Sequence, residues 1–304
     1  MIVFVPEKNE IHTKAIEELK KAGHEIIFGH ELNHDDENKI QILFIRTYIT
    51  ANKEYFNQFP NLRYILKVGV GLDNIDLGEC KKRNIQVINA PQSNSNSVAE
   101  LVVCLMLMLL RHARQQSHRL RHGDRRAKEL MGEELKGKTI GFVGCGAIAR
   151  SITEKILAFQ VKEILGYDPY LDEKTLAGFK IKKVDLNFLI KNSNIISLHL
   201  PLTAETKDLI TLTEFRKMKK NCYLINTSRG GIVNENDLIT ALKQKIIKGA
   251  ALDVFENEPE IKKEFLSLEN IILTPHIGAY THEADYEMSM IPVRKFLVQD
   301  ISNI

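Results

Sequence analysis

The sequence predicts an α/β protein built from two doubly wound parallel-sheet domains. Short apolar runs alternate along the chain with stretches of helical periodicity, a pattern typical of parallel sheets covered by helices. One of these alternations contains a glycine-rich turn between its strand and its helix, at residues 144–149. The length of 304 residues favours two domains over one.

The first domain is predicted over residues 1–98. Its strands are expected at 2–5, 25–28, 42–45, 64–68 and 86–88, with helices near 12–22 and 51–59. Pro6 and Gly23 end two of these elements, as proline and glycine commonly do. The tail at about 279–304 is too short for a domain of its own, and we expect it to complete the first domain.

The second domain is predicted over residues 99–278 and follows the start of a very apolar helix at Ser97. Its Leu101–Leu110 segment is apolar nearly all round, which predicts burial on most sides. Strands are expected at 139–143, 194–200, 222–226, 250–254 and 271–274, and a further apolar run ends at Asp168. The helix after the glycine turn should bury Ile148, Ile152, Ile156 and Phe159, and a helix over 238–242 follows a cap at Asn234.

Composition and charge indicate a cytoplasmic globular protein that acts on a small anion. The net charge of +3 is too small to indicate nucleic acid, although it suits an anionic substrate. The longest apolar run, 101–110, is too short to span a bilayer. The 4 cysteines form no C-x-x-C pair and show no metal spacing, so we expect reduced thiols and no metal site. The N-terminus lacks the features of a signal peptide.

The glycine turn predicts a dinucleotide-binding site. Gly144 permits a tight turn, Gly146 lets the backbone approach a pyrophosphate, and Ala149 is small enough for close helix–strand packing. The amides at the start of the following helix favour the negative charge of the pyrophosphate. Asp168 lies 24 residues after Gly144, close to the spacing of the carboxylate that binds a ribose hydroxyl. The alternative is a glycine turn with a structural role only.

Asp168 also favours NAD over NADP as the cofactor. A carboxylate repels a 2′-phosphate, and the segment 169–171 that follows contains no arginine to bind one.

Three polar residues follow predicted strands of the second domain, where open α/β sheets bind ligands. Arg229 can grip a carboxylate and polarise a neighbouring carbonyl, and His276 can transfer a proton at neutral pH. Glu258, or Glu256 beside it, can raise the pKa of an imidazole through a hydrogen bond. Together they predict reversible hydride transfer at C2 of a 2-oxo acid beside NAD. A surface arginine, a structural histidine and an ordinary loop acid are the alternative interpretations.

Motifs along nearly the whole chain resemble those of the D-isomer-specific 2-hydroxyacid dehydrogenase family. They are I-R-T-Y-I-T (45–50), K-V-G-V-G-L-D-N-I-D (67–76), N-A-P-Q-S-N-S-N-S-V-A-E (89–100), G-C-G-A-I-A (144–149), H-L-P-L-T-A-E-T (199–206), N-T-S-R-G-G-I-V (226–233), A-L-D-V-F-E-N-E-P (251–259) and P-H-I-G-A (275–279). The resemblance implies a Rossmann NAD-binding domain and a flavodoxin-like substrate or lid domain.

The resemblance also implies roles for individual residues. Arg229, Glu258 and His276 match the family's catalytic residues, and a glutamate at 258 argues against the formate dehydrogenase branch. The implied cofactor contacts are Gly144, Gly146, Ala147, Ile148, Asp168, Thr227, Ser228, Asp253 and Gly278, with Asp253 on the nicotinamide amide. The implied substrate contacts are Arg46, Val68, Gly69, Val70 and Gly71, of which Val68–Gly71 forms the carboxylate-binding loop. Two departures are Ala149, for the third glycine, and Arg125, where the family often has a tryptophan.

Within the family the closest resemblance is to 3-phosphoglycerate dehydrogenases. It makes Arg46 a candidate phosphate ligand, with Arg125, Arg126 or Lys128 adding charge, and it places the protein in serine biosynthesis. Because the chain stops at 304, we expect no C-terminal regulatory domain and no serine feedback through one. A glyoxylate/hydroxypyruvate or D-lactate-type reductase is the alternative enzyme. An NAD-sensing corepressor-like binding protein is the alternative of another class.

The segment 111–126 carries six arginines and three histidines, and its role stays open. It is either a solvated helix end and loop or an arm that attracts anions near the active site. By resemblance, the region 98–126 is expected to form a homodimer interface.

Overall fold

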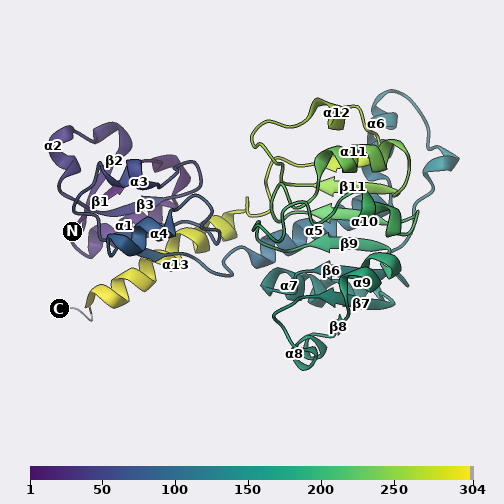
Figure 1. Cartoon of the computed structure of the whole chain (residues 1–304). Coiled ribbons are helices and arrows are strands. Elements are labelled where there is room, and N and C mark those ends of the chain that lie inside the picture. Colours follow the sequence, from purple (N-terminus) through teal and green to yellow (C-terminus); the bar gives the residue numbers. More distant parts are fainter. Residues whose placement is uncertain (302–304) are drawn as a thin grey trace. The chain divides into compact units, whose positions relative to one another are not determined.

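The chain divides into two compact units. Unit 1 consists of Met1–Asn94 and Ala279–Ile304, and unit 2 consists of Ser95–Gly278. The computed structural model describes residues 1–301, so the last positions of the predicted tail, 302–304, lie outside the described residues. Figure 1 shows both units, and each is described by itself below.

Unit 1 is built on a five-stranded sheet in which every neighbouring pair of strands is parallel. Its strands are β1 (Ile2–Val5), β2 (Glu25–Phe28), β3 (Ile40–Ile45), β4 (Tyr64–Lys67) and β5 (Gln86–Ile88). They are ordered β2-β1-β3-β4-β5, which is the flavodoxin-like doubly wound order.

Helices cover both faces of the unit 1 sheet. They are η1 (Lys8–Glu10), α1 (Thr13–Lys21), η2 (Gly29–Glu31), α2 (His34–Glu37), α3 (Lys53–Phe56), α4 (Leu77–Lys82) and α13 (His282–Ile301). On one face α1 and α13 bury Leu19 and Phe296 against β1, β3 and β4. On the other face α3 and α4 bury Phe56 and Cys80. Figure 1 shows α13, in yellow, beside α1, so the last described helix completes the core of the first unit.

Unit 2 is built on a seven-stranded sheet, also parallel throughout. Its strands are β6 (Thr139–Val143), β7 (Glu163–Tyr167), β8 (Lys182–Lys183), β9 (Ile195–Leu198), β10 (Tyr223–Asn226), β11 (Gly249–Leu252) and β12 (Ile271–Leu273). The order β12-β11-β10-β9-β6-β7-β8 is the Rossmann order with one more strand at the edge. The chain changes direction across the sheet at β6, where a doubly wound fold binds its ligand.

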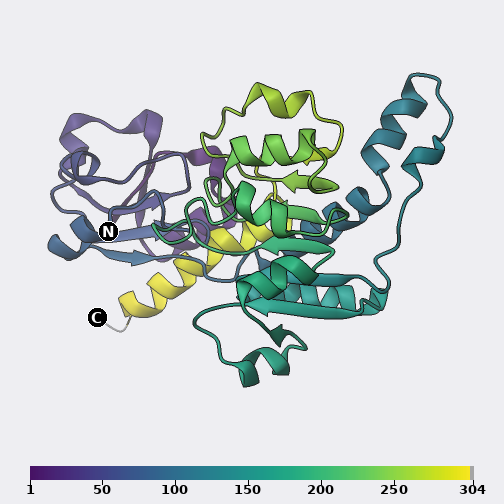
Figure 2. The same cartoon turned by 45° about the vertical axis from the view of Figure 1, so that its right-hand side comes forward.

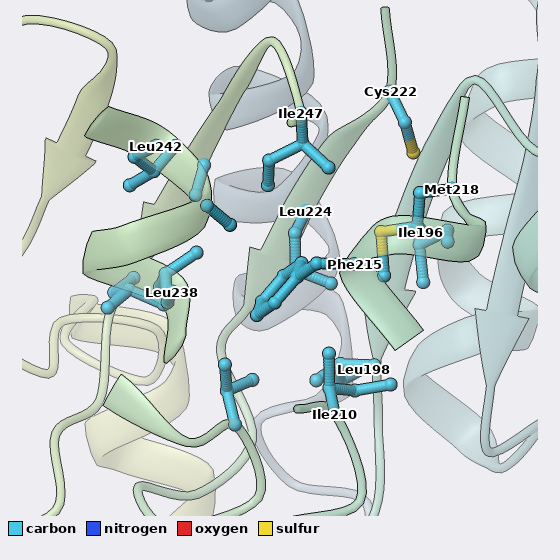
Figure 3. Packing of buried hydrophobic residues seen from close by; sticks show 14 of the residues in the cluster. Ile196, Leu198, Ile210, Phe215, Met218, Cys222, Leu224, Leu238, Leu242 and Ile247 are labelled. Atoms are coloured by element: carbon cyan, nitrogen blue, oxygen red, sulfur yellow. The ribbon is translucent and has the colours of Figure 1, made fainter. Parts of the chain in front are cut away.

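Both faces of the unit 2 sheet are buried under helices. They are α5 (Ser95–Leu110), α6 (Ala113–Arg121), η3 (Lys128–Leu130), α7 (Ala147–Ile156), η4 (Leu157–Phe159), α8 (Glu173–Gly178), α9 (Leu186–Asn192), α10 (Leu212–Lys217), α11 (Glu235–Lys243) and α12 (Lys263–Leu266). Successive strand residues enter different cores: Ile195 packs with α5 and α7, and Ile196 with α9, α10 and α11. Figure 3 shows the core that contains Ile196, where Phe215 of α10 lies against Leu224.

Two details of the predicted helices are wrong. Phe159 is not on the buried face with Ile152 and Ile156: it is 38% exposed. The α-helix ends at Ile156 and continues as 3₁₀-helix, whose three residues per turn change the direction in which Phe159 points. The long apolar helix α5 begins at Ser95 rather than Ser97; along Leu101–Leu110 it is buried or half-buried except at Cys104, in keeping with the predicted burial on most sides.

Helix α6 and the loop that follows it carry the basic residues 111–126. In Figure 2 this segment projects from the strands of unit 2, while Arg114 and Gln115 anchor α6 to the backbone of Ile271 and Glu269. Within residues 1–301, no single helix meets the length and hydropathy of a membrane span. The pair α5 and α6, bent by 64°, meets them together.

Candidate active site

The glycine turn after β6 has the geometry of a pyrophosphate cradle. Gly144 has a φ of +89°, and a β-carbon there would lie 2.3 Å from the carbonyl oxygen of His199. Only glycine fits this position. Gly146 is the N-cap of α7 with an extended backbone, and the space that its β-carbon would occupy is open.

The start of α7 leaves its first amides to a ligand. No side chain caps the helix at Gly146, and Ala147 and Ile148 are its first two residues. Ala149 is fully buried, which brings the helix close to the sheet. Uncapped amides at a helix N-terminus bind phosphate groups well, so this turn suits the pyrophosphate of a dinucleotide.

Asp168, directly after β7, completes this cradle. Its Oδ2 accepts a hydrogen bond from the Cys145 amide at 3.0 Å, and its Oδ1 accepts from the amides of Tyr170 at 2.9 Å and Leu171 at 3.2 Å. These bonds fix the carboxylate beside the glycine turn. Oδ2, which accepts one bond, retains a lone pair for a ribose hydroxyl, and the residues present therefore fit NAD.

The loop after β10 is shaped by Asn226. Its Oδ1 accepts hydrogen bonds from the Ser228 amide and hydroxyl, and its Nδ2 donates to the Arg229 carbonyl at 2.9 Å. Thr227 and Ser228 are buried within this turn, and the guanidinium of Arg229 donates to the Ser228 carbonyl at 2.7 Å. The sequence analysis missed Asn226, although an asparagine at the last position of a strand is a common signal for such a turn.

The loop after β11 carries Glu258. Its Oε1 accepts a hydrogen bond from the Phe255 amide at 2.8 Å, which turns the loop back on itself. Its Oε2 lies 2.7 Å from Nδ1 of His276, which follows β12. The structure thus brings these two predicted residues together, and the hydrogen bond goes to Glu258 rather than to Glu256.

The contact between Glu258 and His276 shifts the pKa of both groups. The hydrogen bond that His276 donates to Glu258 raises the pKa of His276, and it outweighs the effect of burial. Burial raises the pKa of Glu258, but the bonds from His276 and the Phe255 amide outweigh it and the net pKa is lowered. The positive charge of Arg229 also lowers the pKa of both groups, so Arg229 is close enough to interact with them electrostatically. Both shifts favour the charged forms, imidazolium for His276 and carboxylate for Glu258.

Asp253 supports the loop that carries His276. Its carboxylate, 1% exposed, accepts hydrogen bonds from the Thr274 hydroxyl at 2.6 Å and from the amides of Ile277 and Gly278 at 2.8 Å each. The predicted contact with the nicotinamide amide stays a prediction. The sequence analysis missed Thr274 and this supporting role, because the three donors lie more than twenty residues further along the chain.

The predicted substrate residues lie in unit 1. Nη1 of Arg46 donates to Oδ1 of Asp285 at 2.9 Å and to the Glu10 carbonyl at 3.0 Å, and its side chain is 16% exposed. Gly69 has a φ of +111°. Over residues 1–301, the amides of Gly69, Val70 and Gly71 make no hydrogen bond to the protein. Backbone amides that point away from protein acceptors suit a carboxylate, whereas Arg46 is already bound to an acid.

Comparison with known proteins identifies relatives over most of the chain. A family model for the NAD-binding domain of D-isomer-specific 2-hydroxyacid dehydrogenases matches residues 103–278. The hydroxypyruvate reductase of Thermotoga maritima is 39% identical over 260 residues, which are 84% of this chain and 84% of that protein. The D-3-phosphoglycerate dehydrogenase of Methanocaldococcus jannaschii is 37% identical over 278 residues, 90% of this chain. This chain spans 53% of the length of that relative.

A solved structure shares the same arrangement of elements. The D-lactate dehydrogenase of Aquifex aeolicus, crystallised with NAD and lactic acid, superposes with a TM-score of 0.85 at 28% identity. The match covers 100% of this chain and 97% of that one.

Proposed function

This chain belongs to the D-isomer-specific 2-hydroxyacid dehydrogenase family and is an NAD-dependent oxidoreductase, and on that premise we propose that Arg229, Glu258 and His276 catalyse its reaction. The reaction interconverts a 2-oxo acid and a D-2-hydroxy acid. The observation that carries this assignment is the 2.7 Å hydrogen bond between His276 and Glu258, within electrostatic range of Arg229. When bound, the reduced nicotinamide supplies a hydride to C2.

His276 moves the proton. Its Nδ1 is bonded to Glu258, so its Nε2 is the nitrogen that donates to the substrate oxygen during reduction and accepts from the hydroxyl during oxidation. Its side chain is 48% exposed, which leaves the ring accessible to a substrate. Glu258 keeps the imidazole charged before reduction and holds its orientation, and the proton that leaves Nε2 is regained from solvent after turnover.

Arg229 binds the oxygens of the substrate. Its charge stabilises the carboxylate and the oxygen at C2 as negative charge develops there. Asn226 fixes the turn from which the guanidinium extends. The free amides of Gly69, Val70 and Gly71 are assigned to the carboxylate as well, in keeping with the predicted role of Val68–Gly71.

The preferred substrate is proposed to be a small, unphosphorylated acid such as hydroxypyruvate or glyoxylate. The contacts of Arg46 favour it, because the ion pair between its Nη1 and Asp285 already offsets part of the positive charge that would bind a phosphate. The hydroxypyruvate reductase relative, which matches over 84% of its own length, points the same way.

The second candidate substrate is 3-phosphoglycerate, which would place the protein in serine biosynthesis. The relative named D-3-phosphoglycerate dehydrogenase favours it, and so does the arginine at position 46 in I-R-T-Y-I-T. In this alternative the phosphate binds the N–H groups of Arg46 other than those of Nη1, which is bonded to Asp285 and Glu10.

We also propose a homodimer and a cytoplasmic location. The half-buried Leu101, Leu107 and Met108 on α5, with Leu120 at 74% exposed, offer unit 2 an apolar surface for a second copy. The free thiols of the 4 cysteines suit a reducing compartment. Sedimentation velocity of wild type and Leu120→Arg tests the dimer, which the arginine should dissociate.

The deciding experiment is NADH oxidation by the purified protein with hydroxypyruvate, glyoxylate, pyruvate and 3-phosphohydroxypyruvate. We expect a small acid to have the highest kcat/KM, and His276→Gln to abolish turnover with all four. A tenfold preference for the phosphorylated acid, about 1.4 kcal/mol, that Arg46→Ala erases would establish the second candidate instead. NADH binding without turnover of any acid would overturn the enzyme assignment and favour the corepressor-like alternative.

A further inference from the structure

We propose that Glu235 is a positioning residue that holds the loop bearing Glu258 in its catalytic conformation. This inference rests on the function proposed above, because it assigns to Glu235 an effect on the Glu258–His276 pair. Glu235 is the first residue of α11 and follows the loop that carries Arg229. Its effect on the catalytic pair passes through the backbone of 255–258.

The carboxylate of Glu235 reaches from α11 to the Glu258 loop. Its Oε1 accepts a hydrogen bond from the Glu256 amide at 2.8 Å. The preceding amide, that of Phe255, donates at 2.8 Å to Glu258 itself. Two successive amides of this loop are therefore bonded to two carboxylates, one from the helix and one from the catalytic residue.

Lys262 attaches the C-terminal end of the same loop to α11. Its Nζ donates to Oδ1 of Asn236 at 2.7 Å and lies 4.0 Å from Oε2 of Glu235 and 3.9 Å from Oε2 of Glu256. The segment 256–262 is thus attached to the first turn of α11 at both of its ends. Glu258 lies between these two attachments.

The opposite side of the loop is fixed by Gly230. A β-carbon at Gly230 would lie 1.9 Å from the carbonyl oxygen of Phe255, so the Arg229 loop and the Glu258 loop pass in backbone contact. Phe255 is 7% exposed. The backbone at 255–256 is therefore in contact with Gly230 and hydrogen-bonded to Glu235, and both contacts restrict its movement.

An acidic residue in the first turn of a helix can stabilise that helix without being buried. Exposed acids in a first turn interact with the helix dipole without a desolvation cost. Glu235 is 5% exposed, and burial raises its pKa although the Glu256 amide and Lys262 act against that effect. A buried carboxylate that bonds the backbone of another loop is suited to fixing that loop rather than to ending its own helix.

The expected consequence appears at His276. The groups that act on His276 are Glu258, Asp253 and Arg229, and the hydrogen bond from Glu258 has the largest effect on its pKa. A loop that moves without Glu235 weakens this bond, while Asp253 and Arg229 stay on other loops. The pKa of His276 then falls, and kcat for reduction falls with it.

The test compares Glu235→Ala and Glu235→Gln with a matched control, Asp237→Ala. Asp237 is also a first-turn acid of α11 that accepts a hydrogen bond from a backbone amide, but that amide belongs to Leu212, at the start of α10. NMR titration gives the pKa of His276 in each variant, with its signal assigned by its loss in His276→Gln. Thermal unfolding, NADH affinity and kcat are measured on the same samples.

We expect Glu235→Ala to lower the pKa of His276 by about half a unit or more and kcat for reduction by about tenfold, with NADH affinity within twofold. Glu235→Gln keeps an oxygen for the Glu256 amide and should recover most of both. Asp237→Ala should lose stability without changing the pKa of His276. An unchanged pKa of His276 in folded Glu235→Ala would overturn the inference. Because the titration needs no substrate, it separates this failure from failure of the proposed reaction, which would appear as a wild type without turnover.

Discussion

Arg46 at the end of β3 and Asp285 in the first turn of α13 are joined by a 2.9 Å ion pair across 239 positions of the chain. The pair connects the sheet of unit 1 to the helix that completes its core. The backbone amide of Arg46 is held as well, by the Glu7 carboxylate at 2.8 Å. The geometry therefore gives Arg46 a structural task, whichever acid the protein reduces.

Arg46→Ala is predicted to lower the free energy of unfolding by about 1–2 kcal/mol, a value that allows for the partial exposure of the pair. Chemical denaturation measures it, and the double variant with Asp285→Ala should show a coupling of similar size. Arg294→Ala, at a mostly exposed ion pair, is the control and should cost about half a kcal/mol or less. A stable Arg46→Ala with a selective loss of activity on the phosphorylated acid would contradict this prediction.

The two glycines of the cofactor turn should respond differently to alanine. Gly144→Ala places a β-carbon 2.3 Å from the His199 carbonyl in a left-handed backbone, so it should cost about 3 kcal/mol of stability or more. Gly146→Ala meets open space with an extended backbone, so it should fold normally. Its methyl group occupies the space of the pyrophosphate and should weaken NADH binding about tenfold or more. Thermal unfolding and fluorescence titration with NADH measure both, and equal stability of the two variants would contradict the geometry.

Asp253 allows the loop-supporting role to be distinguished from the predicted nicotinamide contact. In Asp253→Asn an NH₂ group, which cannot accept a hydrogen bond, replaces one carboxylate oxygen. The amide of either Ile277 or Gly278 then loses its acceptor, and the loop should no longer hold His276 in position. We expect kcat to fall about tenfold while KM for NADH stays within twofold. Thr274→Val removes one donor to Asp253 and should show a smaller loss of the same kind. A raised KM for NADH with normal kcat would instead support contact with the nicotinamide.

The elements and the cofactor turn could be predicted from local sequence. Alternation of apolar runs predicts strands and helices, and Gly144 and Asp168 are recognisable because their roles depend on spacing along a short segment. The position of His276 after a strand predicted its place at the ligand-binding edge of the sheet. Its pairing with Glu258 rather than Glu256 required the turn that the Phe255 amide makes.

The remaining features depend on contacts between distant segments. Nothing near Arg46 in the sequence indicates Asp285, and nothing near Asp253 or Glu235 indicates which loop amide each carboxylate binds. Phe159 shows a limit of prediction from local sequence. After Ile156 the α-helix becomes a 3₁₀-helix, which changes the direction of the side chains that follow, and the periodicity of the sequence does not reveal this change. Side chains that are distant in the sequence become hydrogen-bond partners only through the packing of the whole unit.

Glu258→Gln should move the pH limbs of both reaction directions to lower pH, which slows reduction and favours oxidation at a given pH. The pKa of His276 is raised from about 6.5 by Glu258, so the charged form required for reduction is present below the raised value and is lost as pH rises through it. Without the carboxylate, that loss begins at lower pH, and kcat for reduction at pH 8 should fall about tenfold while the rate near pH 5.5 changes less. Oxidation requires neutral His276, so its rate in the variant should persist to lower pH than in wild type.

The pH profiles of NADH oxidation and NAD reduction, measured with one substrate pair, check this prediction. The control is His276→Gln, which should show no turnover in either direction at any pH. Shifts of the two limbs in opposite directions along the pH axis would contradict this assignment, because one group that donates in reduction and accepts in oxidation must move both limbs the same way.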